Sequence, residues 1–180
     1  MRPPNIHSII GNRFMEYLVI SLFVISICSL PTFTNGQSDK TDFSGSWVLN
    51  EEKSDFGESQ FRRAALKMTI QQKGNDMTLE KVRTNRSGET YNSTEKLTLD
   101  GKECDNTINN RVRKSTANWS EDGKNLTIST VMVFERDGQS MEIKTVEIYK
   151  ISDTGNNLLI SLTSSSPRGE MKQSFVYDKE

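Results

Sequence analysis

Hydrophobic and polar residues alternate along most of the chain beyond residue 43, and a period of two is typical of β-strands that bury one face. The clearest apolar faces are Ala64, Leu66, Met68 and Ile70; Leu126, Ile128, Met132 and Phe134; and Leu158, Ile160 and Leu162. Within Met141–Ile151, Met141 and Ile143 stand at odd positions, whereas Val146 and Ile148 stand at even ones. A β-bulge near Lys144-Thr145, which adds one residue to the strand, would explain this change of face.

Turns that contain glycine or asparagine separate the alternating stretches. Three of them are Asp-Gly pairs, the strongest short-range signal for a β-hairpin: Asp100-Gly101, Asp122-Gly123 and Asp137-Gly138. Asn109-Asn110 suits a further turn, because asparagine tolerates positive φ. The pattern predicts about ten strands, at 44–50, 64–73, 76–84, 89–99, 102–109, 111–120, 124–135, 139–151, 157–165 and 170–178.

The short connections predict the fold class. Strands that follow one another through tight turns pair in sequence order, and a long meander of this kind leaves two exposed edges unless it closes on itself. We therefore predict an all-β, antiparallel up-and-down β-barrel of about 8–10 strands, with apolar residues inside and polar residues outside. The segment before the second strand leaves room for one short lid helix over Glu58–Ala65.

The first 36 residues have the pattern of a secretory signal peptide. Arg2 and Arg13 precede the apolar run 18–30, whose 13 residues are too few to cross a membrane as a helix. We predict cleavage after Gly36, a polar linker over 37–42, a barrel domain over 43–180, and a secreted or periplasmic location. Two alternatives stay open, an uncleaved membrane anchor over 14–33 and lipidation of Cys28.

Composition narrows the function classes. The 180 residues include 23 Lys+Arg and 24 Asp+Glu, a balance that argues against a nucleic-acid-binding protein. The only histidine is His7, so a processed chain would lack the residue on which Ser-His-Asp catalysis and most zinc sites depend. Cys104 would be its only cysteine, which excludes an internal disulfide. We expect a monomer that is not an enzyme and uses no metal or cofactor.

The opening strand carries the first of two family motifs. Phe43–Asn50 contains Gly45-Ser46-Trp47 and resembles the Gly-x-Trp strand that opens the barrel of lipocalins and fatty-acid-binding proteins, the calycin superfamily. That resemblance implies that Trp47 plugs the closed end of a barrel and that Gly45 gives the chain room to enter. The stretch Trp47–Phe56 is also similar to secreted bacterial lipocalin-like proteins of unassigned function.

The closing strand carries the second motif. Ser174–Lys179 resembles the last strand of fatty-acid-binding proteins, which ends in an Arg-x-Tyr pair that binds a ligand carboxylate. Tyr177 matches the tyrosine, but Phe175 stands where the arginine would be. The resemblance covers the two ends of the barrel and implies the fold, whereas the carboxylate site of the family does not transfer.

A barrel of this size leaves space for one small hydrophobic or amphipathic ligand. We predict that its cavity is lined by Arg113, Trp119, Met132, Phe134, Phe175 and Tyr177. Arg113 shares its strand face with Ala117 and Trp119, and a buried arginine needs an anionic partner. That partner is a ligand carboxylate or phosphate, or an internal glutamate; alternatively the strand twists and leaves Arg113 in water.

Three functions follow from these predictions. The first is an extracytoplasmic carrier of a ligand of the lipid or fatty-acid class, with a membrane contact only through an uncleaved signal segment. The second is a ligand-free barrel that interacts with another protein or with the cell envelope. The third is an enzyme that uses carboxylates or Tyr177, and the missing histidine weighs against it.

Overall fold

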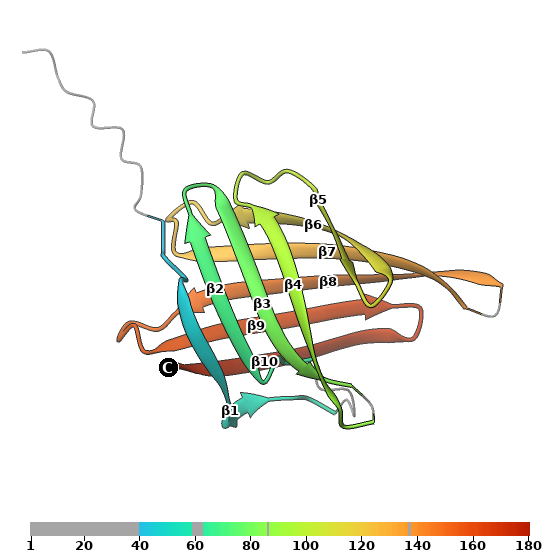
Figure 1. Ribbon diagram of the computed structural model, residues 1–180, viewed down its shortest axis with the longest axis horizontal. Coiled ribbons are helices and arrows are strands. Elements are labelled where there is room, and N and C mark those ends of the chain that lie inside the picture. Colours follow the sequence, from blue (N-terminus) through green and yellow to red (C-terminus); the bar gives the residue numbers. More distant parts are fainter. Residues whose placement is uncertain (1–39, 59–62, 86, 137) are drawn as a thin grey trace, which may run out of the picture. The chain divides into compact units, whose positions relative to one another are not determined.

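The computed structural model describes residues 40–58, 63–85, 87–136 and 138–180, which form one antiparallel sheet (Figure 1). Its ten strands are β1 (Gly45–Asp55), β2 (Lys67–Lys73), β3 (Asp76–Thr84), β4 (Thr90–Thr98), β5 (Cys104–Ile108), β6 (Arg111–Trp119), β7 (Asn125–Arg136), β8 (Gln139–Ile151), β9 (Asn157–Ser166) and β10 (Gly169–Lys179). In the described part of the chain there is no helix that could span a membrane. The predicted signal peptide lies outside the described residues.

The sheet curls into a nearly closed barrel because its first strand pairs with its last. The strand order is β4-β3-β2-β1-β10-β9-β8-β7-β6-β5. Apart from β1 and β10, all strands that are neighbours in the sheet are also consecutive in the sequence. β1 and β10 run antiparallel, with Trp47 opposite Lys179 and Leu49 opposite Tyr177. This topology confirms the predicted up-and-down barrel and, at the level of fold, the resemblance to calycins.

The turns that divide the strands are those that the sequence indicates. Asn109 and Asn110 have φ values of 51° and 59° and join β5 to β6. The lid helix predicted over Glu58–Ala65 is not seen in the described residues of that range. Residues 59–62 lie outside the described residues, and the described residues on both sides of them are not helical.

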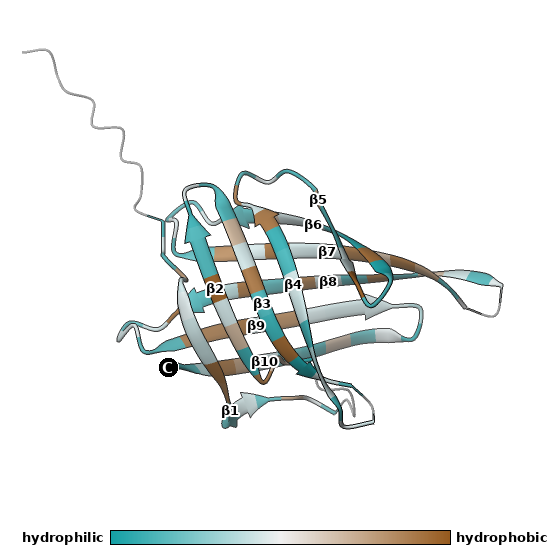
Figure 2. Cartoon of the chain, viewed as in Figure 1, coloured by the Kyte–Doolittle hydropathy of each residue, from teal (hydrophilic) through white to brown (hydrophobic). Residues whose placement is uncertain are grey.

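The predicted β-bulge in β8 is wrong. β8 pairs without interruption with β7 and with β9. Val146 and Ile148 are 37% and 42% exposed and lie on the outer surface, whereas Thr145 and Glu147 face inward. The apolar residues change face because the inward positions Thr145 and Glu147 are polar. Figure 2 shows hydrophobic and hydrophilic bands along the strands. Leu66, also expected inside, is an exposed residue just before β2.

The closed end of the barrel is filled by aromatic side chains. Trp47 is fully buried, and its indole Nε1 donates a hydrogen bond to the Phe43 carbonyl oxygen at 3.0 Å. Phe43 stacks on Trp119 with ring centroids 5.8 Å apart and meets Tyr149 edge-on at 6.2 Å. Gly45 has a φ of 144°, which few other residues adopt, as the chain enters β1. These contacts place Trp47 where a plug would lie.

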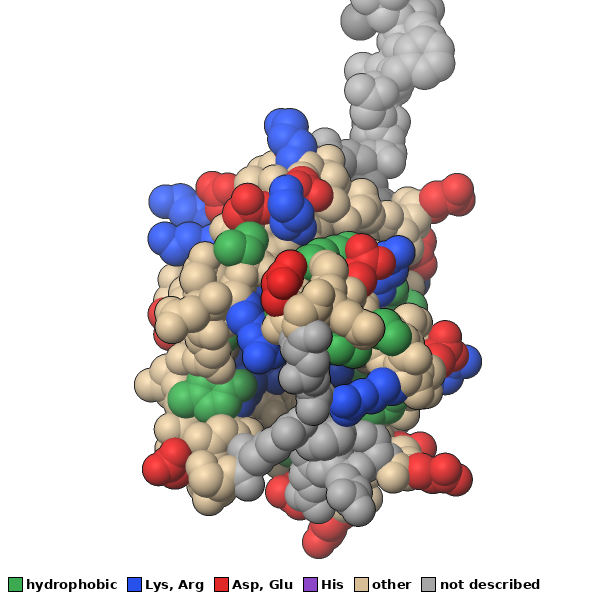
Figure 3. All heavy atoms as spheres, turned by 90° about the vertical axis from the view of Figure 1, so that its right-hand side faces the viewer, with side chains coloured by type: hydrophobic (Ala, Val, Ile, Leu, Met, Phe, Trp, Pro, Cys, Tyr) green, Lys and Arg blue, Asp and Glu red, His purple; other side chains and the backbone are tan. Residues whose placement is uncertain are grey.

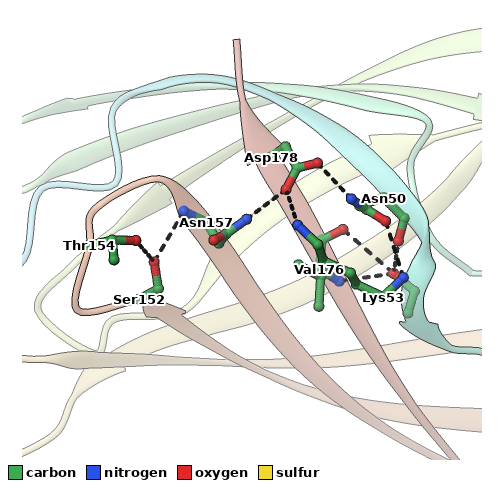
Figure 4. A network of polar contacts seen from close by, with 8 residues as sticks. Asn50, Lys53, Ser152, Thr154, Asn157, Val176 and Asp178 are labelled. Atoms are coloured by element: carbon green, nitrogen blue, oxygen red, sulfur yellow. Dashed lines mark hydrogen bonds and ion pairs between the residues drawn. The ribbon is translucent and has the colours of Figure 1, made fainter.

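A polar network on the outer surface ties β1, β9 and β10 together (Figure 4). The Asp178 carboxylate accepts hydrogen bonds from Asn50 Nδ2 and Asn157 Nδ2, both at 2.6 Å, and from Lys53 Nζ at 3.3 Å. The hydrogen bond from Asn50 is the main reason why the pKa of Asp178 lies below its ordinary value. The ionised carboxylate therefore helps to join the first strand to the last.

Asp178→Asn is expected to lower the melting temperature at pH 7. The difference in melting temperature between the variant and the wild type should become smaller in acid. A carboxyl group whose pKa is depressed by folding stabilises the fold above its unfolded pKa of about 3.9, and this contribution disappears as the pH falls through the folded pKa. Thermal unfolding between pH 7 and pH 2 measures it. Asp153→Asn, in the exposed β8–β9 turn, is the control; a gap between Asp178→Asn and wild type that does not narrow would contradict the idea.

Side chains close the seam between β4 and β5, the two ends of the sheet. The buried Asn106 amide accepts a hydrogen bond from the Lys96 backbone N–H at 2.8 Å and donates one to the Lys96 carbonyl oxygen at 2.9 Å. The Thr98 backbone N–H donates to Cys104 Sγ at 3.3 Å. The Asn106 amide thus supplies the pair of bonds that a neighbouring strand would give to Lys96.

Asn106→Ala is expected to lower the free energy of unfolding by about 2 kcal/mol, because it leaves two backbone groups of Lys96 without their partner. Urea unfolding followed by circular dichroism measures this. Thr107→Ala, at the exposed neighbouring position of the same strand, should change stability by less than about 0.5 kcal/mol. Equal effects of the two substitutions would show that the amide does not hold the seam.

Candidate ligand-binding cavity

A cavity of about 190 Å³ opens at the end of the barrel opposite Trp47. Its basic and acidic lining residues are Arg63, Lys81, Arg83, Arg113, Glu95 and Glu147. Its other lining residues are Ala64, Thr84, Tyr91, Thr130, Met132, Ile143, Thr145 and Leu162. Figure 3 looks at the side of the molecule that carries the β7–β8 hairpin, where Lys and Arg side chains gather around a hollow.

Three ion pairs cross the interior. Lys81 Nζ lies 3.3 Å from Glu95 Oε1 and 3.8 Å from Glu147 Oε2. Arg113 Nη1 lies 3.9 Å from the same Glu95 oxygen. The side chains of Lys81 and Glu95 are only 2% and 7% exposed, so these charges interact with little screening by water.

The pKa of Glu95 reflects this environment. Burial alone would raise the pKa of its carboxyl, but the surrounding cations, first among them Lys81, outweigh burial and lower it. Glu95 is therefore an ionised carboxylate inside the barrel, held by Lys81 and Arg113.

Two further arginines extend the positive region. Burial acts to lower the pKa of Arg83, but the nearby glutamates, Glu147 more than Glu95, raise it overall. The pKa of Arg63 is lowered, first by burial and then by repulsion from Arg113 and Arg83. The Arg83 guanidinium also donates a short hydrogen bond to the Arg63 carbonyl oxygen. Both side chains stay protonated, since arginine is not deprotonated in proteins.

Two tyrosines lie beneath the charged groups and stay neutral. The Tyr149 hydroxyl donates to Glu147 Oε2 at 3.2 Å, and burial is the main cause that raises the pKa of Tyr149. The Tyr177 hydroxyl accepts a hydrogen bond from the Ala65 backbone N–H at 3.1 Å, and burial raises its pKa as well. A tyrosine held in this state is a poor general base.

The structure places four of the six predicted lining residues near the cavity. Arg113 and Met132 line it directly. Phe175 and Tyr177 border a much smaller space of about 10 Å³ that also touches Lys81. The Arg113 side chain is 28% exposed and faces inward, and its anionic partner is the internal Glu95, one of the alternatives that the sequence left open.

The other two predicted lining residues do not line the cavity among the described residues. Trp119 lies at the closed end, stacked on Phe43. Phe134 lies beneath the Arg111 guanidinium, whose carbon is 4.8 Å from the ring centroid.

Sequence reasoning missed Lys81, Glu95 and Glu147, although a signal was present. In β3, Met77 and Leu79 are buried and Lys81 continues their parity toward the open end. In β4, Glu95 has the same parity as Leu97. In these two strands the inward face is apolar near Trp47 and charged near the mouth of the cavity. The inward face could have been found only by continuing the alternation of buried and exposed positions through the charged residues.

No family model and no curated protein matches this chain. Among solved structures, it is similar to the zebrafish ileal bile acid-binding protein complexed with cholic acid, with 18% sequence identity and a TM-score of 0.49. That match covers 77% of this chain and 98% of the other.

Proposed function

We propose that this protein is a binding protein that holds a small amphipathic ligand, with the acidic group of the ligand inside the barrel. The observation that carries the proposal is Arg113: it lines the cavity, and its Nε is buried without a hydrogen-bond partner among the described residues. Buried donors are nearly always satisfied, and an exception calls for an explanation. A carboxylate or phosphate oxygen would satisfy this donor.

Apolar residues on the other side of the cavity suit the remainder of such a ligand. Met132, Ile143 and Leu162 line it from β7, β8 and β9. A volume of about 190 Å³ is below the 300–1,000 Å³ of most ligand pockets. The apolar part of the ligand is therefore short, or it extends through the mouth, as a chain of the lipid or fatty-acid class would do.

The proposal includes an extracytoplasmic location. Its support is the sequence pattern of residues 1–36, with two arginines before a short apolar run and small residues at the cleavage point. A carrier outside the cytoplasm would bind its ligand reversibly and release it to another acceptor.

Arg113→Ala tests the role of the acidic group. Decanoate should bind the variant about tenfold more weakly than the wild type, because a charge-assisted hydrogen bond is lost. Decanol should bind both equally. Lys114→Ala, which removes a charge from the outer face of the same strand, should change neither affinity. Calorimetric titration measures all six values, and an equal loss for decanoate and decanol would contradict the proposal.

One observation favours a ligand-free barrel as the second candidate. Lys81 pairs with both Glu95 and Glu147, so part of the interior charge is neutralised without any ligand. Native mass spectrometry after gentle purification separates the two candidates: a bound small molecule supports the carrier, and an empty barrel with a flat fatty-acid titration supports the interaction domain.

A further inference from the structure

The charges around the cavity do not balance. Its described lining includes four cations (Arg63, Lys81, Arg83, Arg113) and two carboxylates (Glu95, Glu147). Even with both carboxylates ionised, four positive charges less two negative ones leave an excess of two. Unpaired charge in an interior of low dielectric is costly, so such an excess favours a counter-charge of matching size.

The excess lies on one side of the cluster. Within 4.0 Å, Lys81 contacts both glutamates and Arg113 contacts Glu95. Among the described residues, these pairs leave Arg63 and Arg83 without a carboxylate inside that distance. The Arg83 guanidinium instead uses Nη1 to hold the Arg63 carbonyl oxygen, which keeps both residues beside the cavity.

We propose that the cavity selects a dianionic headgroup, a phosphate monoester, over a carboxylate or a sulfate ester. The inference rests on the proposed function and specifies the acidic group that it requires. A phosphate monoester carries about two negative charges near neutral pH and offers three acceptor oxygens. Those oxygens match the planar donor forks of Arg63, Arg83 and Arg113. A carboxylate would neutralise only half of the excess.

Three ligands with one eight-carbon chain test the charge directly: octyl phosphate, octyl sulfate and octanoate. Calorimetry with the full-length chain at pH 7.5 should give octyl phosphate an affinity at least about tenfold higher than either monoanion, since one more charge faces the excess. Inorganic phosphate separates the two possible sources of the headgroup. If inorganic phosphate binds as tightly as octyl phosphate, the cavity is a site for the free ion, and the proposal of an amphiphilic ligand is overturned.

The pH dependence gives a second measurement. The second proton of a phosphate monoester leaves near pH 6, whereas a sulfate ester stays a monoanion. The ratio of the affinity for octyl phosphate to that for octyl sulfate should therefore fall toward one as the pH falls from 7.5 to 5. Octyl sulfate corrects for titration of the protein itself, whose cavity also presents Tyr91 and Glu95 from β4, Glu147 from β8 and the four cations.

Two substitutions change the excess in opposite directions. Arg113→Gln reduces it to one, and we expect a loss of about 100-fold for octyl phosphate and about tenfold for octyl sulfate. Glu147→Gln raises it and should tighten octyl phosphate severalfold, which keeps a test available if Arg113→Gln does not fold. Lys114→Gln, whose ammonium pairs with Glu103 outside the barrel, should leave both affinities unchanged within about twofold.

The outcomes separate the inference from the function on which it rests. Equal affinities for the three octyl ligands would overturn the preference for a dianionic headgroup, whereas the proposed ligand-binding function would still hold. Tighter binding of an eight-carbon dicarboxylate than of octyl phosphate would overturn the preference for a phosphate group, but the preference for two negative charges would stand. Absence of binding by every octyl ligand would overturn both proposals.

Discussion

Glu95→Leu is expected to lower the free energy of unfolding by about 3–5 kcal/mol, because it breaks a buried ion pair from one side. Lys81, 2% exposed, would keep only Glu147 at 3.8 Å, and Arg113 would lose its carboxylate. Urea unfolding at pH 7 measures the change. Thr94→Ala, at the adjacent exposed position of β4, is the control and should stay within about 0.5 kcal/mol of the wild type.

The double variant Lys81→Met/Glu95→Leu distinguishes a broken pair from a damaged core. Replacing both partners by apolar side chains of similar size is often neutral, so the double variant should regain at least half of the stability that Glu95→Leu loses. A double variant that is less stable than Glu95→Leu would show that packing, not unpaired charge, explains the loss.

The lowered pKa of Glu95 gives the pH dependence its sign. A depressed carboxyl pKa stabilises the fold above the unfolded value of about 4.3, and the contribution is lost as the pH falls through the folded pKa. The difference in stability between wild type and Glu95→Leu should therefore be largest near neutral pH and should narrow in acid.

The number and order of the strands could be predicted from the sequence because they depend on local signals. Asn109-Asn110 and Asp122-Gly123 mark hairpin turns without reference to any other part of the chain, and the structure has the hairpins β5–β6 and β6–β7 there. Asp100-Gly101 is an exception, because it joins β4 to β5, which lie at the two ends of the sheet and do not pair as a hairpin. Hairpin connections admit few topologies other than a meander.

The interior charges could not be predicted in the same way, because their meaning depends on pairing between strands. Lys81 and Glu95 are 14 residues apart in the sequence and meet only after β3 pairs with β4. Arg113 was recognised because its strand neighbours on the inward face are small or apolar. The assumption that Val146 and Ile148 face inward because they are apolar also produced the wrong bulge in β8, where Glu147 faces inward instead.

The two ends of the barrel contribute differently to its stability. Charged residues near the mouth contribute little net stability, since their desolvation offsets their attraction. The closed end must therefore hold the fold, and its apolar side chains, with Trp47 the largest of those that are fully buried, supply that stability.

Trp47→Ala is accordingly expected to lower the free energy of unfolding by about 3–5 kcal/mol through the cavity that it leaves. Val48→Ala, at the next position of β1 and 39% exposed, should lower it by less than about 0.5 kcal/mol. Trp47→Phe keeps an aromatic ring but leaves the Phe43 carbonyl oxygen without the indole N–H, which predicts an intermediate loss of about 1–2 kcal/mol. Urea unfolding followed by circular dichroism ranks the three variants. A loss for Trp47→Ala no larger than that for Val48→Ala would mean that the first strand does not plug the barrel.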